Sequence, residues 1–247
     1  MGFAIAQSNL QIMMKLTKIK LYDLAGAEDN RRFSPNCWRV RLALLHKGLP
    51  FEAIPWRFTE KETIAFSGQG KVPVIVDNEE VVYDSWAIAQ YLEESYPEYP
   101  SLFGGEIGKS LSRFVTDWVE AVLNPEIVRL IITDIYSHLH EKDKDYFRQT
   151  REKAFGATLE AISADREQRV VTFANNLTPL RRTLQHQTFL AGQTPAWADY
   201  VVFSSFQWAR CVSSFPLLAA DDPVYSWRDR MLDIFDGEAR KVLAYQS

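Results

Sequence analysis

The sequence predicts an α/β domain followed by an all-α domain, and three features of its 247 residues lead to this prediction. Before residue 100, short runs rich in β-branched and aromatic residues interleave with helical patterns. Residues 96–105, YPEYPSLFGG, combine proline and glycine as linkers do. After them, apolar residues recur at three-to-four spacing, as in Leu177, Leu180 and Leu184. The predicted parts are an N-terminal extension over residues 1–16, an α/β domain over 17–95, a linker over 96–105 and an all-helical domain over 106–247.

The first domain alternates strands and helices in an order that suggests its topology. The predicted strands cover residues 17–24, 51–58, 71–78 and 80–85, and the predicted helices cover 34–47 and 85–95. A tight polar turn joins the last two strands into an antiparallel hairpin. The order is therefore βαβ and then ββα. A right-handed parallel crossover followed by a hairpin is the layout of a thioredoxin-like half-domain.

The composition favours a globular protein with small-molecule or protein partners. Hydrophobic residues make up 47% of the chain and aromatic residues 13%, enough for a sizeable core. The 28 basic residues are balanced by 32 acidic ones, and basic residues cluster only in pairs such as Arg31 and Arg32. Nucleic acid and anionic lipid require a stronger positive field, so we expect neither nucleic-acid nor membrane binding. No stretch approaches the roughly 20 apolar residues of a membrane span.

The cysteines and histidines indicate no metal site. Cys37 and Cys211 lie far apart in the sequence and have no CxxC spacing, so neither a disulfide framework nor a zinc site is indicated. His138 and His140 are two positions apart and point in different directions on a helix. We therefore expect a metal-free protein of the reducing cytoplasm.

One continuous stretch carries the most specific signal. Residues 71–97, KVPVIVDNEEVVYDSWAIAQYLEESYP, contain a strand entered through Val-Pro, a hairpin, an acidic residue followed by serine, and a helix that ends near Tyr-Pro. This combination resembles the glutathione-binding segment of the soluble glutathione transferases, and the resemblance covers nearly the whole chain beyond residue 17. The motifs LYDL, SPxxWRxRxALxHKG and FDG further resemble the bacterial β-aryl etherases and their fungal etherase-like relatives. The resemblance implies glutathione as cosubstrate and a homodimer.

Two short motifs are the candidate anchors for glutathione. Val72 precedes a proline, so its backbone is extended and its N–H and C=O can pair with a short peptide as an added strand would. By resemblance Pro73 is cis, and Lys71 lies beside it in the same site. Asp84 and Ser85 stand where a strand ends and a helix begins, and the helix dipole there favours a carboxylate. The resemblance implies the γ-glutamyl carboxylate, with Asp84 facing its ammonium group; a strand-edge proline and a Ser85 helix cap remain the alternatives.

Ser34 is the candidate catalytic residue. It precedes Pro35 at the predicted start of a helix, so a glutathione thiol beside it would receive a hydroxyl hydrogen bond and the positive end of the helix dipole. Both effects lower the pKa of a thiol. Cys37 is the rival nucleophile and would imply thiol transfer through mixed disulfides, although free cysteine more often packs as core. Asn36 is a further candidate for a polar contact, because a similar Ser-Pro-Asn occurs in the fungal relatives.

A second substrate, a hydrophobic aromatic molecule, is expected between the two domains, where the helical half supplies apolar walls. Aromatic residues at helical spacing are also ordinary core, and this alternative stays open. The candidate wall residues are Trp118, Leu123, Arg129, Tyr136 and Trp208.

Two stretches depart from the family pattern, and one proline interrupts a helix. The loop AGAEDNRRF over residues 25–33 is longer and more charged than the usual turn, so we expect it to reshape the mouth of the site. In TPAWADYVVF, Ala196 replaces the usual Ser, Thr or Asn of a helix capping box, while Asp199 remains. The lost cap should cost about 1 kcal/mol unless Thr194 substitutes for it. Pro125 should bend the helical segment that contains it.

The sequence therefore predicts a glutathione transferase in which Ser34 stabilises the glutathione thiolate, which attacks an aromatic electrophile. Displacement of a phenolate from a β-aryl ether is the etherase form of this chemistry. Broad conjugation or peroxide reduction is one alternative. A non-catalytic ligand-binding module with the same fold is another, because fold alone does not fix function.

Overall fold

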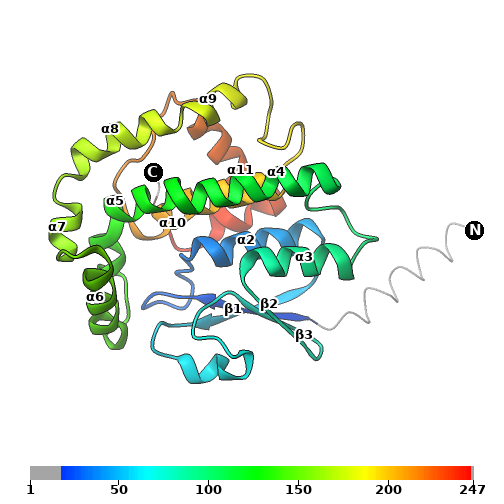
Figure 1. The fold of residues 1–247 in the computed structure, drawn as a ribbon, viewed down its shortest axis with the longest axis horizontal. Helices are drawn as coiled ribbons and strands as arrows, with labels where there is room; N and C mark the ends of the chain where they lie inside the picture. Colours follow the sequence, from blue (N-terminus) through cyan, green and yellow to red (C-terminus); the bar gives the residue numbers. More distant parts are fainter. Residues whose placement is uncertain (1–17, 246–247) are drawn as a thin grey trace, which may run out of the picture.

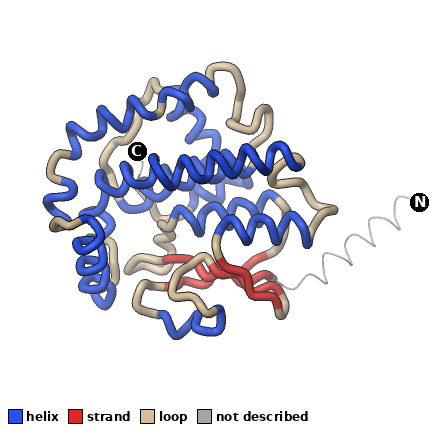
Figure 2. The backbone as a smooth tube through the Cα atoms, in the orientation of Figure 1, coloured by secondary structure: helices blue, strands red, loops and turns tan. Residues whose placement is uncertain are grey.

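The computed structural model describes residues 18–245, so the predicted extension over residues 1–16 lies outside the described residues. The first domain contains a four-stranded mixed sheet (Figures 1 and 2). Its strand order is β2-β1-β3-β4. β1 pairs in parallel with β2 and antiparallel with β3, and β3 pairs antiparallel with β4. The strands are β1 (Ile19–Leu24), β2 (Phe51–Trp56), β3 (Val74–Asp77) and β4 (Glu80–Tyr83). This arrangement confirms the predicted α/β fold class, although each strand is shorter than its predicted range.

Two helices cover one face of this sheet and separate it from the rest of the molecule (Figure 1). They are α2 (Pro35–His46), the crossover between β1 and β2, and α3 (Ser85–Ser95), which follows the hairpin. Apolar side chains of α2 such as Val40 and Leu44 are fully buried, so the helix is enclosed between the sheet and the second domain. The short 3₁₀ helix η1 (Lys61–Ser67) connects β2 to β3.

The second domain consists of helices, as predicted (Figure 2). Helix α10 is buried along nearly its whole length and packs against α2, which joins the two halves. Residues 96–105 form neither helix nor strand, while a domain boundary at this point stays a prediction. The elements are α4 (Glu106–Trp118), η2 (Val119–Leu123), α5 (Asn124–Ser137), α6 (Glu141–Phe155), α7 (Leu159–Ser163), α8 (Arg166–Asn176), α9 (Thr178–Leu184), α10 (Trp197–Val212) and α11 (Pro223–Lys241).

The segment before Pro125 contains a turn that the sequence pattern did not predict. Between α4 and α5, residues Val119–Leu123 form the π-helical turn η2, and Pro125 lies in the first turn of α5. Proline has no N–H to donate to the preceding turn, and a widened turn accommodates it. Because a π turn holds one extra residue, every position after it is rotated by about 100° relative to an uninterrupted α-helix.

The start of α10 shows how the chain tolerates Ala196 at a capping position. The Asp199 carboxylate accepts the Ala196 N–H at 3.2 Å, which is one half of a capping box. It also accepts the N–H of Leu190 at 2.7 Å, the N–H of Ala191 at 3.0 Å and the indole N–H of Trp227 at 2.9 Å. Asp199 is fully buried, and this burial raises its pKa. One carboxylate therefore holds the loop, the helix start and α11 together.

Helix α6 is fastened to the loop that follows β2 by a set of contacts that we name the α6 clasp. The backbone N–H and the hydroxyl of Thr59 donate to the Asp143 carboxylate at 2.9 and 2.6 Å. Lys142 forms an ion pair with Glu60 at 2.5 Å. These contacts join residues more than eighty positions apart and hold α6 against the segment that follows β2.

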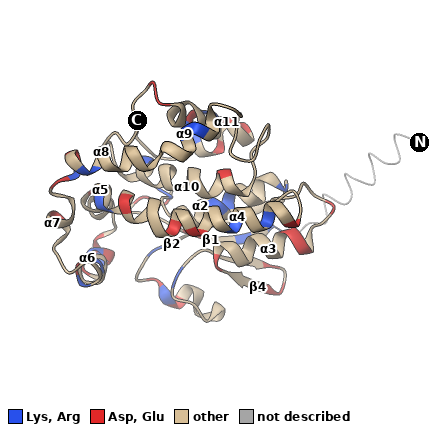
Figure 3. Ribbon diagram, turned by 45° about the horizontal axis from the view of Figure 1, so that its top comes forward, with Lys and Arg blue, Asp and Glu red and all other residues tan. Residues whose placement is uncertain are grey.

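Charged residues of both signs are spread over the surface elements (Figure 3). Several pair across one helical turn, as Arg113 and Asp117 do at 2.8 Å. Within residues 18–245, no helix has both the length and the apolar character needed to cross a membrane. Over the same range, His, Cys, Asp and Glu side chains form no group of three that could hold a metal ion.

Candidate active site

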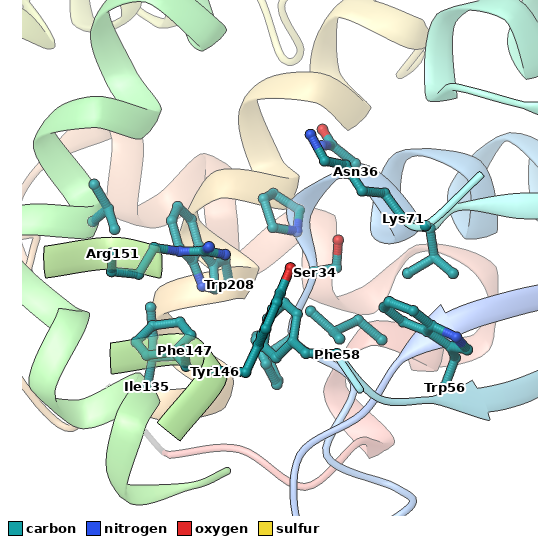
Figure 4. A pocket seen from close by; sticks show the side chains of 16 residues that line it. Ser34, Asn36, Trp56, Phe58, Lys71, Ile135, Tyr146, Phe147, Arg151 and Trp208 are labelled. Carbon is teal, nitrogen blue, oxygen red and sulfur yellow. The ribbon is translucent and has the colours of Figure 1, made fainter. Parts of the chain in front are cut away.

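A cavity of about 260 Å³ opens between the two domains (Figure 4). Its walls come from the ends of β1 and β2 and the start of α2 on one side, and from α5, α6 and α10 on the other. The lining residues are Leu24, Phe33, Ser34, Pro35, Asn36, Trp56, Phe58, Gly70, Lys71, Val72, Val128, Ile135, Tyr146, Phe147, Arg151 and Trp208.

Ser34 lies in the wall of this cavity at the start of α2. Its backbone is extended and Pro35 occupies the first helical turn, as expected for an N-cap. The Ser34 Oγ accepts the backbone N–H of Cys37 at 3.3 Å, which uses one lone pair of the oxygen, and the Cys37 thiol is a second neighbour of the hydroxyl. The sequence-based placement of Ser34 at a helix N-terminus therefore agrees with the geometry.

Asn36 and Cys37 follow Ser34 in the first turn of α2 but point to different surroundings. Asn36 lines the cavity, and its Oδ1 is buried without a hydrogen-bond partner in the described structure. Cys37 is fully buried and is not a lining residue. Burial, together with the neighbouring Asp23 carboxylate, raises the pKa of the Cys37 thiol well above its usual range. A thiolate at Cys37 is therefore strongly disfavoured.

The Val72–Pro73 peptide bond is cis. Lys71 and Val72 line the cavity from the segment that enters β3, whereas Pro73 is buried and is not a lining residue. The β3 strand itself begins only at Val74, so the backbone of Val72 precedes the ladder hydrogen bonds with β1 and β4. This leaves its N–H and C=O free of that ladder.

Asp84 and Ser85 lie at the start of α3, outside the lining of the cavity. Asp84, at φ 69°, is the helix cap: one of its carboxylate oxygens accepts the N–H groups of Trp86 and Ala87, both at 3.0 Å. Asp84, and not Ser85, therefore caps α3. Ser85 is buried, and its side chain contacts Arg39.

Arg39 on α2 links this helix to the start of α3. Arg39 is fully buried and donates to the Ser85 Oγ at 3.5 Å and to the Glu120 carboxylate at 2.8 Å. Its Nε and Nη2 have no hydrogen-bond partner in the described structure. Burial lowers the pKa of Arg39, with Glu120 acting in the opposite direction. A buried cation thus lies directly behind Ser85.

Of the five predicted wall residues, Trp208 lines the cavity and the other four do not. Leu123 is core, and Trp118 packs against the core. Arg129 lies over the Phe155 ring at 5.0 Å in a separate hollow, and Tyr136 lies beneath Arg148. Leu123 is the last residue of the π turn, and Arg129 and Tyr136 come after this turn on α5. The extra residue of the π turn therefore changes the face of α5 on which these two side chains lie.

The sequence analysis missed most of the aromatic wall. Trp56 ends β2 and Phe58 lies just after it, and the carboxyl ends of parallel strands commonly border binding crevices, so this signal was available. Tyr146, Phe147 and Arg151 lie on α6, whose sequence is strongly charged and resembles a solvated helix. Phe58 joins the two groups, with ring centroids 6.1 Å from Tyr146 and 5.8 Å from Phe147.

Two family models match the chain in order. The model described as the glutathione S-transferase N-terminal domain matches residues 30–100, and the model for the C-terminal domain matches residues 110–216. Among curated proteins, the zeta class glutathione S-transferase of Euphorbia esula is 35% identical over 114 residues, which are 44% of this chain and 47% of that protein. The chain thus spans about half the length of this relative.

Solved structures share the fold over most of the chain. The glutathione transferase GSTFuA3 of Phanerochaete chrysosporium has a TM-score of 0.73 at 25% identity, covering 92% of this chain and 94% of that one. The Ceriporiopsis subvermispora glutathione S-transferase CsGST63524, solved with glutathione, has a TM-score of 0.71 at 22% identity, covering 90% and 93%. With both domain models matched in sequence order on this shared fold, the chain belongs to the glutathione S-transferase superfamily, whose cosubstrate is glutathione.

Proposed function

We propose that this protein is a glutathione transferase in which the Ser34 hydroxyl stabilises the glutathione thiolate, and that the thiolate attacks an electrophilic carbon of an aromatic substrate. The observation that carries the proposal is the position of Ser34. It caps α2 and lies in the wall of a cavity whose lining includes aromatic side chains of both domains.

The surroundings of Ser34 favour a negative charge on sulfur. The hydroxyl oxygen accepts the Cys37 N–H, and the hydroxyl proton can rotate to donate to the glutathione thiolate. The positive end of the α2 dipole acts at the same point. Lys71 and Arg151 line the cavity, and its described lining contains neither Asp nor Glu. All three effects lower the pKa of a thiol placed there.

Glutathione itself would lie along the first domain. The backbone of Val72 can pair with the cysteinyl portion of the tripeptide as an added strand would, beside Lys71 and Pro73. Ser85, with the Arg39 cation behind it, suits the γ-glutamyl carboxylate, and Asp84 suits the ammonium group. The unpartnered Oδ1 of Asn36 offers an acceptor in the same cavity.

The etherase form of the reaction would form a C–S bond to glutathione and break an aryl-ether C–O bond, releasing a phenolate with the bonding electron pair. The motifs around Ser34 and Asp84 support this form. Simple conjugation and peroxide reduction use the same thiolate, and a binding module would need no thiolate at all.

A substrate panel separates these functions. Incubation with glutathione and either β-aryl ethers, chloronitrobenzenes or cumene hydroperoxide should release free phenol from the ethers, measured by chromatography against reactions without protein. Adducts or reduced peroxide without phenol would favour the broader activities. Retention on immobilised glutathione with turnover of none of them would favour the binding module and contradict the enzymatic proposal.

We also propose that the protein is a homodimer of the cytoplasm. Helix α4 carries Ile107, Leu111 and Phe114 on one side, exposed to 81%, 63% and 71%, and a second copy would cover them. Both cysteines are free and buried, which is compatible with a reducing compartment. Light scattering should show a dimer that Leu111→Glu dissociates, and a monomeric wild-type protein would contradict the first part.

A further inference from the structure

We propose that the aromatic electrophile bound by this cavity carries an acidic group, such as a carboxylate, and that Arg151 binds this group. The inference rests on the proposed function and deepens it by naming the substrate class. Arg151 extends from α6 into the cavity beside Trp208, while Lys71 lies on the other side of Ser34 (Figure 4).

The Arg151 side chain is packed between aromatic rings. Its guanidinium carbon lies 5.5 Å from the centroid of the Phe58 ring and 5.0 Å from that of Phe147. Both rings belong to the cavity lining, and burial lowers the pKa of Arg151. Guanidinium groups have such high pKa values that the side chain stays charged. The cavity therefore holds a partly desolvated cation at a fixed position.

No carboxylate neutralises this cation within the described residues. The hydrogen bond that Arg151 donates goes to its neighbour Thr150, at 3.1 Å, and Arg151 takes part in none of the ion pairs. Asp143 lies about two turns earlier on α6, but it is outside the cavity lining and its Oδ1 accepts from Thr59 in the α6 clasp. Arg148, by contrast, pairs with two glutamates outside the cavity.

A bound acid would supply the missing counter-charge. A guanidinium presents two parallel N–H donors to a carboxylate, and its planar fork retains this geometry on an aromatic face. A neutral ligand of the same size would exclude water from the cation without replacing its hydrogen bonds, which is unfavourable. The cavity should therefore prefer an anionic aromatic substrate to its neutral ester.

A matched pair of electrophiles tests this preference. Chlorodinitrobenzoate, with chlorine para to the carboxylate, and its methyl ester both react by attack of the glutathione sulfur on the ring carbon, which forms a C–S bond as chloride leaves with its electron pair. The carboxylate or ester is unchanged. Each kcat/KM is divided by the uncatalysed rate constant of the same compound, so that intrinsic reactivity cancels.

We expect Arg151→Met to lower the normalised kcat/KM for the acid roughly 10- to 100-fold and that for the ester less than about 3-fold. Arg151→Lys should restore part of the loss for the acid. Arg129→Met is the matched control, because Arg129 also lies on an aromatic ring but outside the cavity, and it should change neither value.

Equal effects of Arg151→Met on acid and ester would overturn the inference. So would a weaker affinity for glutathione with an unchanged acid-to-ester ratio, because Arg151 would then serve the cosubstrate. If the wild type turns over neither compound and no member of the substrate panel, the proposed function fails separately. Binding of the two S-aryl glutathione products, followed through tryptophan fluorescence to which Trp56 and Trp208 of the lining contribute, then decides the inference, and equal affinity of the wild type for both would refute it. The same comparison in Arg151→Lys decides it if Arg151→Met does not fold.

Discussion

Replacement of Ser34 by alanine removes the hydroxyl that we propose stabilises the glutathione thiolate. The hydroxyl would donate one hydrogen bond to a charged sulfur, and such a bond contributes about 1.5 to 3 kcal/mol. One pKa unit corresponds to about 1.4 kcal/mol, so the pKa of bound glutathione should rise by about 1 to 2 units. At a pH below the pKa of glutathione bound to the wild type, turnover should fall on the order of 10- to 100-fold. Affinity for glutathione should change little, because the tripeptide is anchored elsewhere.

The assay is ultraviolet titration of the thiolate in the presence of saturating glutathione, paired with turnover of a chloronitrobenzene. Ser34→Ala also removes an N-cap, which by itself destabilises a helix by about 1 kcal/mol. Thr158→Ala controls for this loss, because Thr158 caps α7 with a similar hydrogen bond to the Ala161 N–H at 3.2 Å and lies outside the cavity lining. An unchanged thiolate pKa in Ser34→Ala would refute the role of the hydroxyl.

Three further substitutions test other parts of the account. Ser85→Ala should weaken glutathione binding roughly 10-fold by calorimetry with little change in kcat, since it removes a donor to the carboxylate; unchanged binding in this variant and in Asp84→Asn would mean that the anion site is misplaced. Cys37→Ala should keep most activity and lose about 1 kcal/mol of stability, whereas loss of turnover together with a glutathione adduct on wild-type Cys37 by mass spectrometry would establish thiol transfer instead. Asp199→Ala should lower the free energy of urea unfolding by about 3 kcal/mol or more, because four N–H groups lose their acceptor, and a change within error would contradict its role in joining α10 to α11.

Local sequence signals predicted the first domain well because its elements are determined by local chemistry. Alternating apolar residues and a polar turn specify the β3–β4 hairpin, and a serine followed by proline specifies the start of α2. The same signals indicated Ser34 and Val72, which both line the cavity. Ser85 was placed correctly at a helix start, but its contact with Arg39 joins two helices and has no local signature.

The electrophile wall could not be predicted in the same way, because it depends on how helices pack. Arg129 and Arg151 are the same residue type on adjacent helices, and each lies on an aromatic ring, yet the cavity contains only Arg151 of the two. A π turn rotates α5 after Leu123, and the α6 clasp sets the face that α6 presents. Neither feature follows from hydrophobic periodicity, which assumes an uninterrupted helix.

The α6 clasp also separates substitutions that would detach α6 from substitutions that would change only the electrophile wall. Its polar contacts are made by Thr59, Glu60, Lys142 and Asp143, none of which lines the cavity, whereas the wall residues lie further along the same helix. Substitutions in the later turns of α6 can therefore alter which electrophile is accepted while the attachment of the helix and the thiol end on α2 stay intact. Gene duplicates of this protein could diverge in substrate through a few codons of one helix, without rebuilding the chemistry that they share.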